Sequence, residues 1–214
     1  MAIFSRSIRL LLTVVTMAIL LSACAGRGKG PLLLHPIPPE SDGYTLNSGA
    51  LEFEVPGMKV TARPLDWRLV EKNYREGEQI SPFGPEEGAH SPYLFFSLLL
   101  ENTSDQKKID FSTFRVILYS RIANLVTPLD VSDIYVMRSG SPDLQERALS
   151  FQKTCFDGPT VVYPNSSEER YLVFATPKGK SKKLTLSLSD IYLGLDSYDV
   201  KFLFEAFPVE EKKQ

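Results

Sequence analysis

The chain has 214 residues and a formal net charge of −2, with 23% charged and 43% hydrophobic residues. This length and composition allow a sizeable core, which excludes a disordered chain and leaves room for one domain or two small ones. Apart from one short lysine run, the basic residues are dispersed, so we expect no nucleic-acid partner.

The N-terminus has the pattern of an export leader. Arg6 and Arg9 form a basic start, and residues 10–21 are apolar apart from two threonines. This run is shorter than the roughly 20 residues that a membrane-spanning helix needs. A basic start, a short apolar run and small residues before the cut are typical of a signal peptide. We therefore expect residues 1–23 to be a leader, not part of the fold.

The leader ends in a motif with chemistry of its own, Leu21-Ser22-Ala23-Cys24. These four residues resemble the lipobox of bacterial lipoproteins. The resemblance implies cleavage between Ala23 and Cys24, lipidation of Cys24 and a membrane anchor of acyl chains, of which two hold stably. Ala25 in place of an aspartate points, through the same resemblance, to the outer membrane facing the periplasm. The alternatives are an ordinary secretory peptide cut elsewhere and a short membrane anchor.

Residues 24–43 are rich in glycine and proline, a composition that favours a tether over packed structure. The leucines at 32–34 interrupt it, and they form either an apolar patch in the linker or a segment that docks on the domain.

The folded domain is expected at residues 44–207, followed by a charged tail at 208–214. Residues 51–55 and 58–62 alternate apolar and polar side chains around Pro56 and Gly57, the pattern of a half-buried hairpin. Apolar runs predict further strands at 93–100, 114–119, 122–129, 161–163, 171–175, 184–188 and 200–206. Residues 93–100 are apolar on both faces, so this strand should be covered on each side.

Between two of these strands, residues 67–74 mix apolar and charged side chains and predict a strand or an irregular edge. Residues 75–92 read as a long loop, and loops of this length are often functional. Trp67, Tyr74 and Phe83 are candidates for a partner surface, because interfaces use exposed aromatic residues. For Trp67 a packed position in the core or at a sheet edge is an equal alternative.

One helix is predicted, at residues 142–156, starting at Ser141 and Pro142 and ending at Gly158. Ala148, Phe151 and Cys155 would lie on its buried face. If Cys24 carries lipid, Cys155 has no disulfide partner, and we expect a buried structural thiol.

Many short strands with one helix in a long connection predict a mainly β fold, an antiparallel β-sandwich. The strand order, and the turn at 163–167 before the strand at 171–175, resemble the immunoglobulin-like domains of bacterial envelope lipoproteins. Tyr171 stands where such a domain has its corner tyrosine, but the paired cysteines are absent.

Groups that carry chemistry are scarce. His35 and His90 are the two histidines and form no zinc set with a core cysteine, and the sequence has no phosphate loop or dinucleotide fingerprint. We expect no cofactor. Asp190, Asp196 and Asp199 are a weak alternative for a calcium site, because the apolar residues among them favour packing.

The lysine run at residues 178–183 precedes a predicted strand. Its favoured role is a solvated turn that keeps a sheet edge from pairing, and the alternative is binding of lipid headgroups.

The sequence thus favours a lipid-anchored, non-enzymatic envelope protein whose sandwich binds another envelope component through loops or a strand edge. An envelope hydrolase that uses carboxylates and a small-ligand or calcium-binding module are the alternatives.

Overall fold

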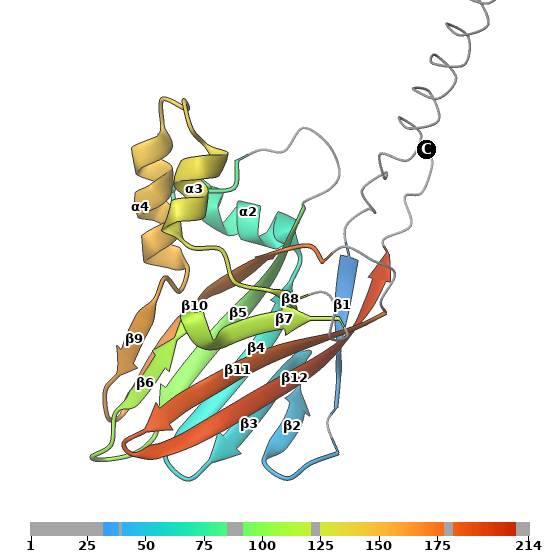
Figure 1. The fold of residues 1–214 in the computed structure, drawn as a ribbon, viewed down its shortest axis with the longest axis vertical. Helices are drawn as coiled ribbons and strands as arrows, with labels where there is room; N and C mark the ends of the chain where they lie inside the picture. Colours follow the sequence, from blue (N-terminus) through green and yellow to red (C-terminus); the bar gives the residue numbers. More distant parts are fainter. Residues whose placement is uncertain (1–31, 39, 85–91, 121–124, 178–181, 209–214) are drawn as a thin grey trace, which may run out of the picture.

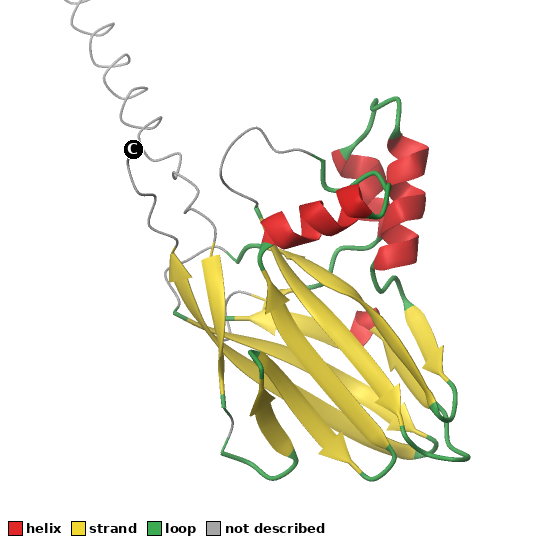
Figure 2. Ribbon diagram, turned by 180° about the vertical axis from the view of Figure 1, so that it is seen from behind, coloured by secondary structure: helices red, strands yellow, loops and turns green. Residues whose placement is uncertain are grey.

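The computed structural model describes residues 32–38, 40–84, 92–120, 125–177 and 182–208, and these form two antiparallel β-sheets with helices at one end (Figures 1 and 2). The first sheet has the order β1-β12-β11-β6-β9, with β7 and β8 continuing from β11. Its strands are β1 (Leu32–Ile37), β6 (Ile109–Ser112), β7 (Val116–Tyr119), β8 (Leu125–Val126), β9 (Pro159–Val162), β11 (Lys183–Leu193) and β12 (Asp196–Pro208). The second sheet has the order β10-β5-β4-β3-β2, from β2 (Tyr44–Asn47), β3 (Ala50–Val55), β4 (Met58–Leu65), β5 (Tyr93–Asn102) and β10 (Ser166–Ala175).

The main core lies between the two sheets. Alternate residues of β5 point into it, and so do alternate residues of β11 and β12, as expected for strands with a period of two. Phe96 packs with its ring centroid 5.1 Å from that of Phe204 and 5.8 Å from that of Phe174. The predicted mainly β, antiparallel sandwich is therefore confirmed. The predicted hairpin is confirmed too, with Gly57 at a φ of 92° between β3 and β4.

A second core lies on the outer face of the second sheet, under three helices that we call the cap. The cap consists of α2 (Trp67–Glu76), α3 (Val131–Met137) and α4 (Leu144–Thr154). Phe95 of β5 and Val173 of β10 point outward, away from the main core. The buried residues that pack against them from the cap and the segments next to it are Val70, Tyr74, Phe83, Ile134, Phe151 and Cys155. The strand predicted at 93–100 is therefore covered on both faces, by the main core on one side and by the second core on the other, as predicted.

The number of helices differs from the prediction. The helix expected at 142–156 is α4, but α2 replaces the strand or irregular edge expected at 67–74, and α3 was not foreseen. A short 3₁₀ turn at Thr113–Arg115 also precedes β7. Asp66 begins α2 by accepting the backbone N–H of Arg68 at 2.8 Å, and Asp130 begins α3 with a capping box.

The start of the folded domain also differs. Residues 24–43 were expected to be a tether and the domain to begin at 44, but Leu32–Ile37 form β1 at the edge of the first sheet. Leu32 and Leu34 pack against the main core, which explains the leucines in a segment rich in glycine and proline. Docking on the domain was the correct alternative for them.

The strand after the lysine run is not at an edge. β11 pairs with β12 on one side and with β6 and β7 on the other. The lysines precede this pairing, because the first pair with β7 is Thr185 with Tyr119, whereas Lys183 pairs with Glu205 of β12. Residues 178–181 lie outside the described residues, and Lys182 and Lys183 are exposed.

Candidate functional site

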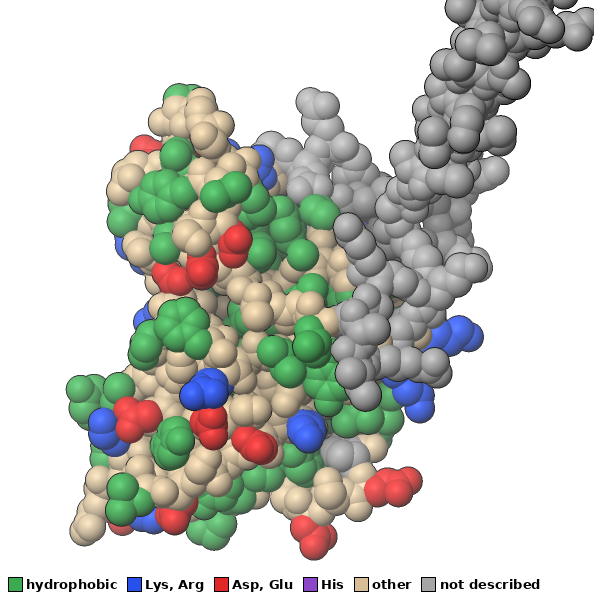
Figure 3. Space-filling model, in the orientation of Figure 1, with side chains coloured by type: hydrophobic (Ala, Val, Ile, Leu, Met, Phe, Trp, Pro, Cys, Tyr) green, Lys and Arg blue, Asp and Glu red, His purple; other side chains and the backbone are tan. Residues whose placement is uncertain are grey.

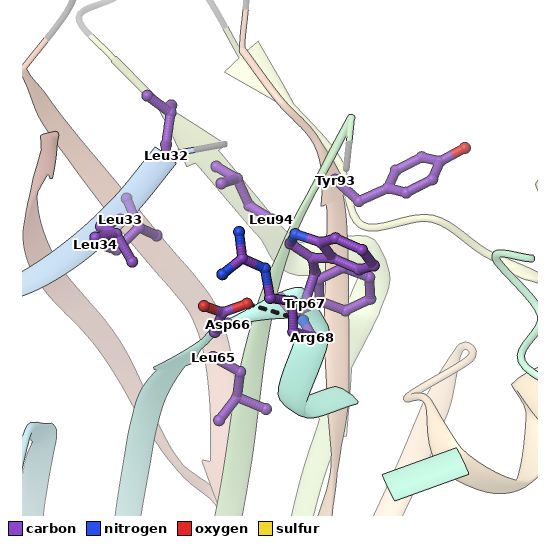
Figure 4. A pocket seen from close by; sticks show the side chains of 10 residues that line it. Leu32, Leu33, Leu34, Leu65, Asp66, Trp67, Arg68, Tyr93 and Leu94 are labelled. Carbon is purple, nitrogen blue, oxygen red and sulfur yellow. Dashed lines mark hydrogen bonds between the residues drawn. The ribbon is translucent and has the colours of Figure 1, made fainter. Parts of the chain in front are cut away.

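A small pocket opens where β1, the start of α2 and the start of β5 meet (Figure 4). Its volume is about 110 Å³, enough for one side chain of a partner but not for a large ligand. The walls are mostly apolar, from Leu32, Leu33, Leu34, Leu65, Trp67, Tyr93, Leu94 and Phe95, and the polar residues Asp66 and Arg68 join them.

Trp67 and Arg68 bring side chains that donate hydrogen bonds to this pocket. The Nε1 atom of Trp67 is buried and has no hydrogen-bond partner in the described part of the protein. Figure 4 shows it on the edge of the indole ring that faces Leu94 and the guanidinium of Arg68. A buried donor without an acceptor costs free energy. Trp67 therefore carries an unsatisfied donor beside the pocket, and an acceptor oxygen reaches it only when the indole ring or its neighbours move.

Trp67 also lines a second, wider groove. This groove has a volume of about 420 Å³ and runs along α2 toward α4. Its walls are Trp67, Glu71, Tyr74, Arg75, Gln79, Ile80, Ser81 and Arg147. Positions 67, 71, 74 and 75 follow helical spacing, so one face of α2 forms most of one wall.

Charged groups fix the far wall of the groove. Arg147 donates to the backbone carbonyl of Ser81 and, at 2.7 Å, to the carboxylate of Asp143. This guanidinium and the hydroxyl of Ser141 hold the pKa of Asp143 well below its usual range. The Nε atom of Arg147 is buried without a partner in the described residues. Glu71 accepts the hydroxyl of Ser81 at 2.5 Å, so the loop after α2 is tied to both helices.

The predicted partner surface of three aromatic residues is corrected by these positions. Tyr74 and Phe83 are only 3% and 2% exposed, because α2 and the segment after it turn both side chains into the cap core. Tyr74 shares a hydrogen bond of 2.5 Å with the hydroxyl of Thr154, and its burial raises its pKa. Trp67 is half-buried and packs against the same core, which agrees with the alternative of a packed position. It also lines the pocket and the groove.

Replacing Asp66 with alanine tests how much its N-terminal cap on α2 contributes to stability. The substitution removes the acceptor for the Arg68 N–H, and we expect a loss of about 1 kcal/mol in the free energy of unfolding. Urea denaturation measures it. Asp66→Ser keeps an acceptor at this position and should lose much less; an equal loss in both variants would show that the cap bond is unimportant.

Cys155 is a free, buried thiol, as predicted. Burial raises its pKa to about 12, so the thiol is neutral at pH 8 and is a poor nucleophile. We expect a Cys24→Ser variant to react with a thiol reagent at pH 8 only after denaturation. Rapid reaction of the native protein would contradict this buried position.

The three aspartates considered for calcium do not form a site. Asp196 pairs with Lys107 at 2.7 Å, and Asp190 lies 3.5 Å from Arg115. Asp199 accepts the backbone N–H of Asp190 at 3.0 Å. Within the described ranges, no three acidic, histidine or cysteine side chains gather where a metal ion would fit.

The remaining predicted residues have these positions. Tyr171 accepts a hydrogen bond from Asn73 at 3.1 Å, so its hydroxyl contacts α2 instead of the backbone that a corner tyrosine contacts. His35 lies on β1 with its ring centroid 5.2 Å from that of Phe207. Ala23, Cys24 and His90 lie outside the described residues.

Sequence reasoning did not identify Arg68, Glu71 and Arg147 as residues of the site. The available signal was the aspartate before Trp67 followed by apolar residues at 67, 70 and 74, which is the start of an amphipathic helix. That helix would have placed Glu71 beside Trp67.

Comparison of the chain with protein-family models, with curated proteins and with solved structures finds no match. In the part of the chain that the structure describes, none of the helices combines the length and the apolar composition of a membrane span.

Proposed function

We propose that this protein is a lipid-anchored envelope protein of bacteria, without enzymatic activity, whose sandwich and cap bind another envelope protein at the Trp67 site. We define the Trp67 site as the pocket and the groove together. The anchor is Cys24, at the end of the lipobox-like motif, and the outer membrane facing the periplasm is its proposed place. The sandwich is proposed to be of the immunoglobulin-like type.

The observation that carries the binding role is the buried, unpartnered Nε1 of Trp67 at the junction of a pocket and a groove that are both largely apolar. Tryptophan and arginine are enriched among the residues that dominate binding energy in interfaces. Arg68 lines the pocket and Arg147 lines the groove, and Trp67 lines both.

The site has room for a segment of protein. The pocket accepts one apolar side chain, and the groove offers room for the residues next to it. A backbone carbonyl or carboxylate of that segment would supply the acceptor that Trp67 lacks. Among the described residues that line the site, Asp66 and Glu71 are the two acids. Asp66 accepts the backbone N–H of Arg68 and Glu71 accepts the hydroxyl of Ser81, so both carboxylates have structural roles.

Site-specific crosslinking in intact cells tests this proposal. A photoreactive residue replaces Arg68, at the pocket, or Arg75, at the groove; the control position is Leu195, which is 98% exposed in the turn between β11 and β12. We expect a discrete crosslinked species from the first two positions and not from the control. Adding Trp67→Ala should weaken it at least tenfold, since hot-spot truncations cost about 2 kcal/mol or more.

The proposal fails if Leu195 gives the same species, or if Trp67→Ala leaves the crosslinks unchanged while thermal unfolding shows that the variant is folded.

A further inference from the structure

One end of the first sheet carries exposed apolar and basic side chains that lie outside the Trp67 site, apart from Leu33, which also lines its pocket. We call it the β1 end and define it by Leu33 and His35 of β1, Phe207 of β12, and Lys182 and Lys183 at the start of β11. Figure 1 shows the start of β1 beside the end of β12, with the turn between β11 and β12 at the opposite end of the sheet. Leu33 and Phe207 pair directly across the two strands.

The β1 end combines exposed apolar and basic side chains. Leu33 is 43% exposed and Phe207 is 41% exposed, so the outer face of the sheet presents a pair of large apolar groups to solvent. In the next row, Glu205 lies between His35 and Lys183. Figure 3 shows Lys or Arg side chains projecting from the end of the sheet where β11 begins.

The length of the chain before β1 limits where the β1 end can be. This step rests on the proposed function, because it takes Cys24 as the anchor. Residues 25–31 connect Cys24 to Leu32 and reach at most about 28 Å when fully extended. β12 has 13 residues and spans about 40 Å. The anchor is therefore attached to the β1 end by a link shorter than the sheet, and the far turn at Leu195 is the distal end.

We propose that the β1 end docks on an anionic phospholipid surface. Leu33 and Phe207 enter the interface between headgroups and acyl chains, and Lys182 and Lys183 lie against anionic headgroups, as basic residues near a bilayer do. The domain then stands on the membrane with its long axis away from the bilayer. The Trp67 site lies close to the surface, because Leu32 and Leu33 also line its pocket.

Energy transfer from tryptophan to a dansyl-labelled headgroup lipid measures this orientation. The chain has one tryptophan, so Trp67 reports on the β1 end. The full lipidated protein is reconstituted into vesicles that contain phosphatidylglycerol, and a Trp67→Phe, Leu195→Trp variant reports on the distal end. We expect transfer from Trp67 to be several-fold more efficient than transfer from position 195. Equal transfer from both positions would overturn the docking proposal.

Charge reversal separates docking from simple anchoring. Lys182→Glu with Lys183→Glu should reduce transfer from Trp67 on vesicles with phosphatidylglycerol and leave it unchanged on pure phosphatidylcholine. The matched control is Lys107→Glu with Lys108→Glu, which reverses two exposed lysines near the distal turn and should change nothing. If both double variants behave alike, docking by the β1 end is wrong although the anchor stands. If the parent protein does not float with vesicles at all, the anchor at Cys24 is wrong, and the docking proposal falls with it.

Discussion

Replacing Phe151 with alanine is expected to lower the free energy of unfolding by about 3–5 kcal/mol, the usual cost of removing a buried phenylalanine side chain. Phe151 is fully buried at the centre of the cap core, with its ring centroid 6.1 Å from that of Phe83. The cavity would lie between α4 and the outer face of the second sheet, where α2 and the Trp67 site are supported. Urea denaturation followed by circular dichroism measures the loss.

Leu149→Ala is the matched control for this substitution. Leu149 lies on the same helix but is 47% exposed and belongs to neither core. We expect Leu149→Ala to lower the free energy of unfolding by well under half as much as Phe151→Ala does. Similar losses at the two positions would mean that the cap is not packed as a second core.

Replacing Cys24 with serine is expected to move the protein almost completely from the membrane fraction to the soluble fraction. The thioether that would hold the diacylglyceryl group cannot form on serine, so the variant lacks the proposed acyl anchor. Membrane flotation followed by immunoblotting of each fraction measures the distribution.

Cys155→Ser controls for the loss of a thiol as such. It removes the other cysteine, which lies in the cap core, and should fractionate like the parent even if it lowers stability. A Cys24→Ser variant that still floats with membranes would contradict the anchor, whatever Cys155→Ser does.

The sandwich could be predicted because its signals are local. The period-two alternation at 51–55 and 58–62 and the turn at Gly57 each follow from a few neighbouring residues. The strand at 93–100 carried a further signal, since apolar residues on both faces require cover on both sides. The order of the strands in each sheet could not be predicted from local patterns, because pairings such as β1 with β12 join residues from opposite ends of the chain.

Helix α2 was missed because its local pattern is weak. Its buried side chains are Val70 and Tyr74, with Trp67 half-buried, and the other positions are charged or polar apart from the exposed Leu69. Packing against Phe95 and Val173 of the second sheet supplies the stabilisation that the segment lacks by itself. β1 was missed for a similar reason. Three leucines beside prolines do not predict a strand by themselves, and the segment is a strand because it pairs with β12.

Among the residues that line the site, Trp67 and Tyr74 were named from the sequence as candidates for a partner surface. Tyr74 and Phe83 were chosen as exposed aromatic residues of a loop, and the helix that buries them was not foreseen. Arg147 could not be found, because it is 66 residues from Ser81, to which it donates, and only the tertiary fold brings them together.

Both the proposed function and the docking of the β1 end depend on the chemistry at Cys24. The most direct measurement is the intact mass of the protein extracted from membranes, with fragmentation of its N-terminal peptide. The expected result is a chain that begins at Cys24 and carries the mass of a diacylglyceryl group on that residue. An N-terminus at Met1 or at any other residue, with Cys24 unmodified or absent, would contradict the account.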